Sequence, residues 1–298
     1  RQMNISEPEF NNIRHLVKRL CGIWLTDDKK YLVVSRLSPV LKKNQIESYS
    51  ALVQRASSAN NIRLHEEIIE AITTHETSFN RDGHPFEEFR RTILPNLIAT
   101  RAECQRVAGL SFGKIRIWSA AVSTGQEAYS LAMGILEHIQ TQPRNAAHGF
   151  VVTPENFSIL GTDICASSLS TAKEGCYHER DLERGLGNDL KQKYFVERER
   201  KFWIHQAAKN LIDFRRLNLI HPFGDLVGMD MVLCRNVLIY FDDSTRRAVT
   251  EQLIMCLAPG GMLMLGAAES IPVLPPGIVQ EQFGRTVVFR KSAAKQMG

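Results

Sequence analysis

The stretch Ile115 to Met133, IRIWSAAVSTGQEAYSLAM, constrains the fold more than any other part of the chain. Its first half is an apolar run typical of a buried strand, and its second half places apolar residues at helical spacing. The turn Ser123-Thr124-Gly125 separates the halves, so a strand should feed a helix through a glycine turn. Such a unit offers backbone N–H groups at a helix N-terminus to a cofactor. An ordinary α/β crossover would show the same pattern, and one glycine is a weaker signal than a full GxGxxG. A cofactor-binding turn and a plain crossover therefore both stay open here.

Residues 1 to about 100 show helical patterns only. Ser6-Glu7-Pro8-Glu9 has the form of a capping box with proline in the first turn. A second helix is expected from about Asp27, with Tyr31 facing inward. Between Lys29 and Lys43 it carries five basic residues and no acidic one, which fits either a solvated helix face or a docking face for an acidic protein surface. We therefore expect a helical domain over residues 1–90 and a linker helix over residues 91–112.

From Ile115 onward, strand patterns alternate with helix patterns. This alternation predicts an α/β domain over residues 113–298, with a doubly wound, mostly parallel sheet covered on both faces. The tail around Gly284 predicts a hairpin that adds an antiparallel edge. Two short strands are expected at 195–198 and 201–204, and a third at Leu211 to Leu217.

The composition, 44% hydrophobic and 23% charged, is that of a globular protein. No apolar run approaches the length of a membrane span, so no direct membrane insertion is expected. A net charge of +5 is mild and does not argue for a nucleic-acid partner. The six cysteines are scattered without a CxxC pair, which favours core residues in a reducing cytoplasm over zinc ligands or disulfides. The histidines show no ligand spacing, and no metal is expected.

Polar residues follow several of the predicted strands. Asp163 ends one strand, where it could accept hydrogen bonds from ribose hydroxyls or cap the next helix. Glu127 lies in the first turn of its helix, which suits the helix dipole and would equally suit a bound ammonium group. Arg235 and Asn236 directly follow another buried strand. The polar segment ITTHETSFNR, residues 72–81, fits a ligand-facing loop or a plain helix cap.

Six segments occur in an order and spacing that resemble a known family: TTHETSFNRD, IRIWSAAVSTGQEAYSLAM, ILGTDI, LNLIHPF, CRNVLIYFD and LAPGGMLMLGAAESI. Together they resemble the CheR-type chemoreceptor glutamate O-methyltransferases over nearly the whole chain. CRNVLIYFD together with the STGQE stretch is specific to that family, whereas the APGG turn is shared by many methyltransferases.

The resemblance implies S-adenosylmethionine as the cofactor, with S-adenosylhomocysteine as the product, in a cleft between the helical domain and the sheet. The cofactor contacts that it implies are His75, Thr77, Arg81, Glu127, Asp163, Asn218, Leu219, Arg235 and Asn236. His75 stands where the family usually has asparagine, Ala128 replaces a proline, and Ala267 replaces a common histidine. From position, we expect Arg81 to hold the substrate carboxylate and Tyr240 to line the methyl channel.

The implied function is methylation of chemoreceptor glutamates by a cytoplasmic monomer. From its charge, we expect the basic helix Lys29 to Lys43 to dock on the receptor. Family members carry a small antiparallel subdomain, here placed at 194–218, and some use it to hold a receptor's C-terminal pentapeptide by strand addition. The turn Glu197 to Arg200 lacks a glycine to supply positive φ, so pentapeptide-independent docking is expected.

Two other classes of protein would share part of this pattern. A non-catalytic cofactor-binding scaffold would keep the fold without turnover, although Arg81, Asp163 and Arg235-Asn236 are all present. A nicotinamide-dependent dehydrogenase would share the sheet, but the first turn lacks the second and third glycines that it needs.

Overall fold

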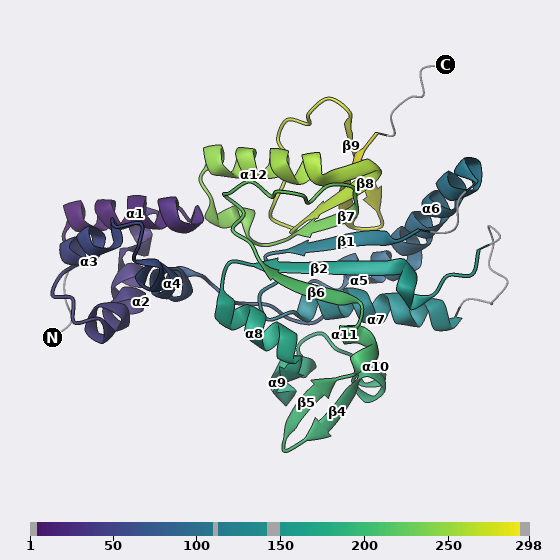
Figure 1. The fold of residues 1–298 in the computed structure, drawn as a ribbon, viewed down its shortest axis with the longest axis horizontal. Coiled ribbons are helices and arrows are strands. Elements are labelled where there is room, and N and C mark those ends of the chain that lie inside the picture. The colour runs from purple at the N-terminus through teal and green to yellow at the C-terminus, as the bar shows by residue number, and fades with distance from the viewer. Residues whose placement is uncertain (1–4, 110–112, 142–149, 293–298) are drawn as a thin grey trace.

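Residues 5–109, 113–141 and 150–292 are described by the structure, a computed structural model. Two units stand side by side in Figure 1: a helical unit of four helices, and an α/β unit built on a twisted sheet. The helical unit comprises α1 (Glu7–Cys21), α2 (Lys30–Lys43), α3 (Tyr49–Ala56) and α4 (Ile62–Ile72), with a 3-10 turn at Asp27–Lys29. No helix among the described residues combines the length and apolar character needed to cross a bilayer.

The start of α1 is formed as predicted. The Ser6 side chain accepts a hydrogen bond from the Glu9 backbone, and the Glu9 carboxylate accepts one from the Ser6 backbone. The expectation for Tyr31 is wrong, because its side chain is 68% exposed. The inward face of α2 is formed instead by Val33, Leu37 and Val40-Leu41, whose spacing of four, then three, follows one side of the helix.

The helical unit ends earlier than the expected limit at residue 90. Its apolar core runs to Ile72, whereas Phe79, Phe86 and Phe89 pack in the core of the α/β unit. The segment expected as a linker also belongs to that core, since Ile93 and Leu97 are buried in it. This segment consists of α5 (His84–Glu88), a π-helical turn (Phe89–Ile93) and α6 (Leu94–Ala108).

The large sheet has the strand order β6-β2-β1-β7-β8-β10-β9. Its strands are β1 (Ile115–Ala120), β2 (Phe157–Asp163), β6 (Ile212–Arg216), β7 (Met229–Cys234), β8 (Leu257–Leu265), β9 (Ile278–Phe283) and β10 (Thr286–Lys291). The first five in spatial order run parallel, and the β9–β10 hairpin adds antiparallel strands at one edge. The predicted doubly wound sheet and its antiparallel tail are therefore confirmed.

Helices cover both faces of this sheet, as alternation along the strands requires. In β1, Ile115 and Ile117 pack in the cluster that contains α7 (Gln126–Thr141) and α8 (Ala166–Glu174), together with α5 and α6. Trp118 and Ala120 pack on the opposite face with α12 (Asp243–Cys256). Short elements complete the unit: 3-10 turns at Pro154–Asn156 and Leu238–Tyr240, and helices α9 (Glu179–Glu183), α10 (Asn188–Tyr194) and α11 (Gln206–Lys209).

The small antiparallel sheet exists, but its third strand differs from the expectation. The order is β3-β5-β4, with β3 at Cys176–Tyr177, β5 at Lys201–Ile204 and β4 at Phe195–Arg198. The strand expected at 211–217 is β6, which pairs in parallel with β2 and places Phe214 opposite Gly161. Phe214 is buried in the main core, so burial of this apolar residue draws the segment into the large sheet.

The β4–β5 turn also corrects an expectation. Glu199 and Arg200 have φ values of 51° and 61°, so this glycine-free turn does adopt the left-handed conformation. Two such residues form the tight connection whose twist suits a hairpin. The turn is short and carries two long charged side chains.

The two units are joined where the end of α1 lies beside the segments that follow β6 and β7. Trp24 N donates to Tyr240 O at 2.8 Å, and Asn218 Nδ2 donates to Leu20 O at 2.8 Å. Gly22, with φ of 80°, allows the close approach, since a Cβ there would lie 2.5 Å from the Ile220 side chain. Lys18 forms an ion pair with Asp242, which caps α12.

The Lys18–Asp242 pair should make the joint sensitive to acid. Burial alone would raise the pKa of Asp242, but hydrogen bonds from Lys18 and Thr245 outweigh it and hold that pKa well below its usual range. A depressed carboxyl pKa contributes stability above the unfolded value of about 3.9 and loses it as the pH falls below that value. We expect Lys18→Met to lower the free energy of unfolding by about 0.5–1 kcal/mol at pH 7, with the difference shrinking below about pH 4. Urea unfolding from pH 3 to 7 measures this, and a difference that is constant with pH would contradict it.

Candidate functional site

A pocket lies at the carboxyl ends of β1, β2, β6 and β7, on the side of the sheet that faces the helical unit (Figure 1). The helical unit contributes Cys21 and Ile23, and the loop between α4 and α5 forms another wall. Every site residue expected from the sequence lines this pocket: His75, Thr77, Arg81, Glu127, Asp163, Asn218, Leu219, Arg235, Asn236 and Tyr240. Sequence reasoning missed Cys21 and Ile23, since nothing in the sequence brings the end of α1 to the sheet.

The turn between β1 and α7 is built from residues in the left-handed region. Ala121, Ser123 and Gly125 have φ values of 57°, 52° and 97°. A side chain at position 125 would place its Cβ 2.9 Å from the Cβ of Ala172, so glycine is required for both conformation and space. Left-handed conformations at two non-glycine residues are costly, and they turn residues 121–123 onto the pocket wall.

Asp163 braces this turn against the end of β2. One carboxylate oxygen accepts from Ser123 N at 2.8 Å, and the other accepts from Cys165 N at 2.9 Å. Burial raises the pKa of Asp163, against the opposing effect of these backbone hydrogen bonds. A carboxylate can accept about four hydrogen bonds, so acceptor capacity remains for a ligand in the pocket.

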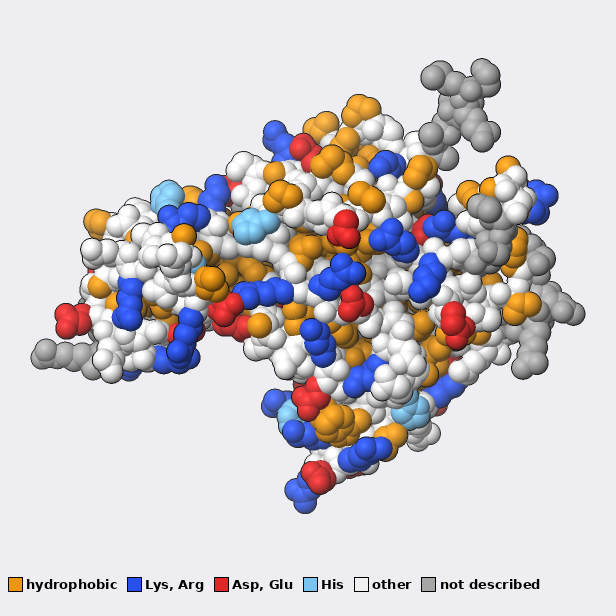
Figure 2. Space-filling view, viewed as in Figure 1, with side chains coloured by type: hydrophobic (Ala, Val, Ile, Leu, Met, Phe, Trp, Pro, Cys, Tyr) orange, Lys and Arg blue, Asp and Glu red, His pale blue; other side chains and the backbone are white. Residues whose placement is uncertain are grey.

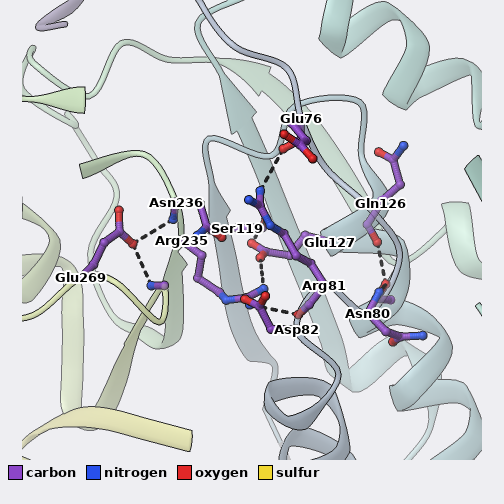
Figure 3. A network of polar contacts seen from close by, with 12 residues as sticks. Glu76, Asn80, Arg81, Asp82, Ser119, Gln126, Glu127, Arg235, Asn236 and Glu269 are labelled. Atoms are coloured by element: carbon purple, nitrogen blue, oxygen red, sulfur yellow. Dashed lines mark hydrogen bonds and ion pairs between the residues drawn. The ribbon is translucent and has the colours of Figure 1, made fainter. Parts of the chain in front are cut away.

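Arg235 is the centre of the polar network in Figure 3. Its side chain is 2% exposed and pairs with Glu127 at 3.0 Å and with Asp82 at 2.8 Å. It also donates to the backbone oxygen of Arg81 at 3.0 Å. Glu127 accepts a further hydrogen bond from Ser119 Oγ at 2.8 Å. Arg235 thus holds three segments together: the end of β7, the start of α7 and the loop before α5.

Two buried polar atoms of the segment that follows β7 have no hydrogen-bond partner: Nε of Arg235 and Oδ1 of Asn236. Buried polar atoms of this kind are rare and call for a partner that a ligand can supply. Asn236 also has a φ of 59°. Strain and an orphaned acceptor coincide at this pocket residue, as is common where a ligand binds.

Glu269 fixes the segment after β7, and sequence reasoning assigned it no role. Its carboxylate accepts backbone hydrogen bonds from Asn236 at 2.8 Å, Val237 at 2.9 Å, Ile239 at 3.3 Å and Gly266 at 2.7 Å. Figure 3 shows this carboxylate facing the backbone at Asn236. In the sequence, Glu269 is visible only as an acidic residue after β8. The fold brings it to the end of the neighbouring strand, β7.

Two of the expected cofactor contacts, His75 and Arg81, lie in the loop between α4 and α5, and both already contact other groups of the protein. Both ring nitrogens of His75 face hydroxyls, Nδ1 at 2.9 Å from Ser168 Oγ and Nε2 at 3.1 Å from Thr73 Oγ1. Arg81 donates to Glu76 O at 2.9 Å and forms no ion pair with a carboxylate of the described residues. Its guanidinium therefore remains available to an acidic substrate.

The chain matches two family models and several known proteins. The model "CheR methyltransferase, SAM binding domain" matches residues 75–283, and "CheR methyltransferase, all-alpha domain" matches residues 8–73. Chemotaxis protein methyltransferase 1 of Pseudomonas aeruginosa is 35% identical over 289 residues, covering 97% of this chain and 99% of that protein. The chemotaxis protein methyltransferase of Vibrio anguillarum is 36% identical over 270 residues, covering 90% and 91%.

Proposed function

The chain belongs to the CheR methyltransferase family and is a methyltransferase of chemotaxis that uses S-adenosylmethionine; from that premise we propose that its substrates are glutamate side chains of chemoreceptors, methylated in the cytoplasm. The observation that carries the proposal is the pocket between the two units. It combines a buried carboxylate, Asp163, with Arg81, a cation that has no carboxylate partner among the described residues.

A cofactor bound in this pocket would supply partners for its unused polar atoms. The free acceptor positions of Asp163 suit the ribose hydroxyls, and Asn218 and Leu219 lie beside them in the pocket wall for the adenosine. The methionine end would lie toward Glu127, Arg235 and Asn236, where charged groups and the orphaned Asn236 Oδ1 are found. His75 and Thr77 complete the wall from the helical side.

The chemistry requires positioning more than proton transfer. A glutamate side chain with a pKa near about 4.3 is already ionised at neutral pH, so it can attack the methyl group without a general base. Its oxygen must lie behind the methyl carbon, in line with the sulfur, and orientation of this kind is worth up to roughly 7–11 kcal/mol. Arg81 would hold the carboxylate, and Tyr240 would line the path of the methyl group. The sulfonium and carboxylate charges cancel in the transition state, which a water-poor pocket favours.

The test is transfer of radiolabelled methyl from S-adenosylmethionine to a receptor's cytoplasmic fragment, compared with the same fragment carrying glutamine at its acceptor glutamates. We expect base-labile label on the first fragment alone. Label on neither fragment, with the cofactor still bound, would favour a non-catalytic scaffold.

The basic face of α2 is our candidate for receptor docking. Figure 2 shows Lys and Arg side chains on the lobe formed by the helical unit, with acidic side chains among them. Several of these basic side chains contact groups of the helical unit itself. Lys30 pairs with Glu7, Lys43 pairs with Glu67, and Arg36 donates to the backbone at the end of α4. Lys42 is exposed and forms no ion pair within the described part of the chain, so it is the residue to test.

We expect Lys42→Glu to slow receptor methylation several-fold at low salt, because reversing one charge at an interface removes an attraction and adds a repulsion. The matched control is Lys173→Glu, an exposed lysine on α8. Initial rates at increasing salt measure the effect, which should fade as screening increases. Equal slowing by both variants would assign it to net charge rather than to α2.

We also propose docking that is independent of a C-terminal receptor pentapeptide. Glu199 and Arg200 form the whole connection between β4 and β5, and their long side chains leave no open glycine backbone for a peptide. We expect methylation of a receptor fragment to be unchanged when its last five residues are removed. Calorimetric titration with the pentapeptide is the second measurement, and saturable micromolar binding at the edge strand β4 would contradict the proposal.

A further inference from the structure

A cluster of three metal-ligating side chains lies at the joint between the two units, beside the cofactor pocket. Glu70 is in α4, His75 is in the following loop, and Cys165 precedes α8. One potential ligand atom from each residue lies within 4.8 Å of the other two, and among the described residues no other group of this kind occurs. Cys165 is distant in sequence from Glu70 and His75, so the sequence gives no signal that the three side chains meet. The sequence analysis expected Cys165 to be a core residue.

The surrounding hydroxyls already hold these side chains in position. Ser168 Oγ lies 2.9 Å from His75 Nδ1, and Ser167 N donates to a Glu70 carboxylate oxygen at 3.1 Å. A histidine that binds a metal through one nitrogen commonly donates its other N–H to such a neighbour. Ser168 would then fix the ring so that Nε2 is the free nitrogen.

His75 Nε2 and the Cys165 thiol both lie close to the hydroxyl of Thr73. Its oxygen lies 3.1 Å from His75 Nε2 and 3.0 Å from Cys165 Sγ. Thr73 donates its own hydrogen to Ile69 O at 2.8 Å. In the tautomer that donates Nδ1–H to Ser168, Nε2 would present its lone pair to the Thr73 oxygen, whose own hydrogen is already donated to Ile69. A cation between these atoms would satisfy that lone pair.

We propose that Glu70, His75 and Cys165 form a binding site for a transition-metal ion of the zinc(II) class. One oxygen, one nitrogen and one sulfur ligand, with a fourth position open to water, make a donor set that zinc accepts. Zinc bonds of about 2.0–2.3 Å require the three ligand atoms to draw together by on the order of 1 Å. The ion can enter from either side, since Thr73 and His75 line the cofactor pocket and Glu70 and Ser167 line a groove on the outer surface.

A bound ion would connect the units at the point where their cores touch. Cys165 belongs to the α/β unit in sequence, but its side chain packs in the apolar cluster of the helical unit. An ion held by α4, the loop and the start of α8 would therefore tie the loop that carries Thr77 and Arg81 to the sheet. Zinc should raise the unfolding midpoint of the protein, because the three ligands come together only in the folded state.

The test is a cobalt(II) titration of the whole reduced chain, since cobalt replaces zinc and reports a thiolate ligand through a near-ultraviolet charge-transfer band. We expect the band to saturate at one equivalent and to disappear when zinc is added. Cys165→Ser should abolish it, whereas the matched control Cys104→Ser, an exposed cysteine on α6, should retain it. Glu70→Gln and His75→Asn should each weaken cobalt binding at least tenfold.

Thermal unfolding of the same variants keeps the test decisive. Zinc should raise the unfolding midpoint of the native chain and of Cys104→Ser, and should leave the midpoint of Glu70→Gln nearly unchanged. This comparison remains available even if Cys165→Ser does not fold. A native chain without a saturable cobalt band, or a band that survives in Cys165→Ser, would overturn the proposal.

Discussion

Replacing Arg235 by alanine is expected to destabilise the folded protein by about 3–5 kcal/mol, the cost of removing one partner from a buried ion pair. The guanidinium is 2% exposed and serves two carboxylates, and the side chain of Glu127 is itself 13% exposed. Without Arg235, Glu127 and Asp82 would both lose their cationic partner. The three segments that form this side of the pocket would lose their common partner, so methyl transfer should be lost as well.

Urea unfolding of Arg235→Ala measures the loss, with Arg106→Ala as the control for removing an arginine. Arg106 pairs with Glu103 on the exposed face of α6, with a side chain 65% exposed, and its removal should leave the unfolding midpoint nearly unchanged. Arg235→Lys should fall between the two, because one ammonium group cannot reproduce the two-sided contact. A loss below about 1 kcal/mol in Arg235→Ala would show that the network is not what holds these segments together.

Replacing Asp163 by alanine is expected to weaken binding of S-adenosylhomocysteine by about 1–3 kcal/mol, or about 5- to 150-fold. The substitution removes the acceptor offered to the ribose and leaves the N–H groups of Ser123 and Cys165 without their partner. Asp163→Asn should lose less, because its amide keeps one acceptor oxygen. The control is Asp213→Ala on the neighbouring strand β6, where the carboxylate is 65% exposed.

Isothermal titration calorimetry provides the affinities, and a pH series adds a second readout. Burial raises the pKa of Asp163 in the free protein, and hydroxyl donors from a ligand favour its ionised form. Affinity for the cofactor should therefore fall as the pH is lowered, and Asp163→Asn should lose this dependence. Identical affinities in the native protein and Asp163→Ala would remove Asp163 from the cofactor site.

The sequence alone determined the parallel sheet and the location of the pocket. The change from strand spacing to helical spacing around Gly125 needs only local information, and it was confirmed as β1 and α7. Because the carboxyl ends of parallel strands share one edge, Glu127, Asp163 and Arg235 had to come together once the strands were identified. The capping box at Ser6 was equally local and equally correct.

Tertiary packing decided what no local pattern contains. The strand β6 could have joined either sheet, and burial of Phe214 beside Gly161 placed it in the large one. Tyr31 fits a helical stripe in sequence, but the position of α4 determines which side of α2 is buried. The partners of Arg235, the backbone contacts of Glu269 and the meeting of His75 with Cys165 all join segments distant in sequence. Such contacts exist because buried charges and polar atoms must find partners in the folded chain, and only the packed structure determines which ones are within reach.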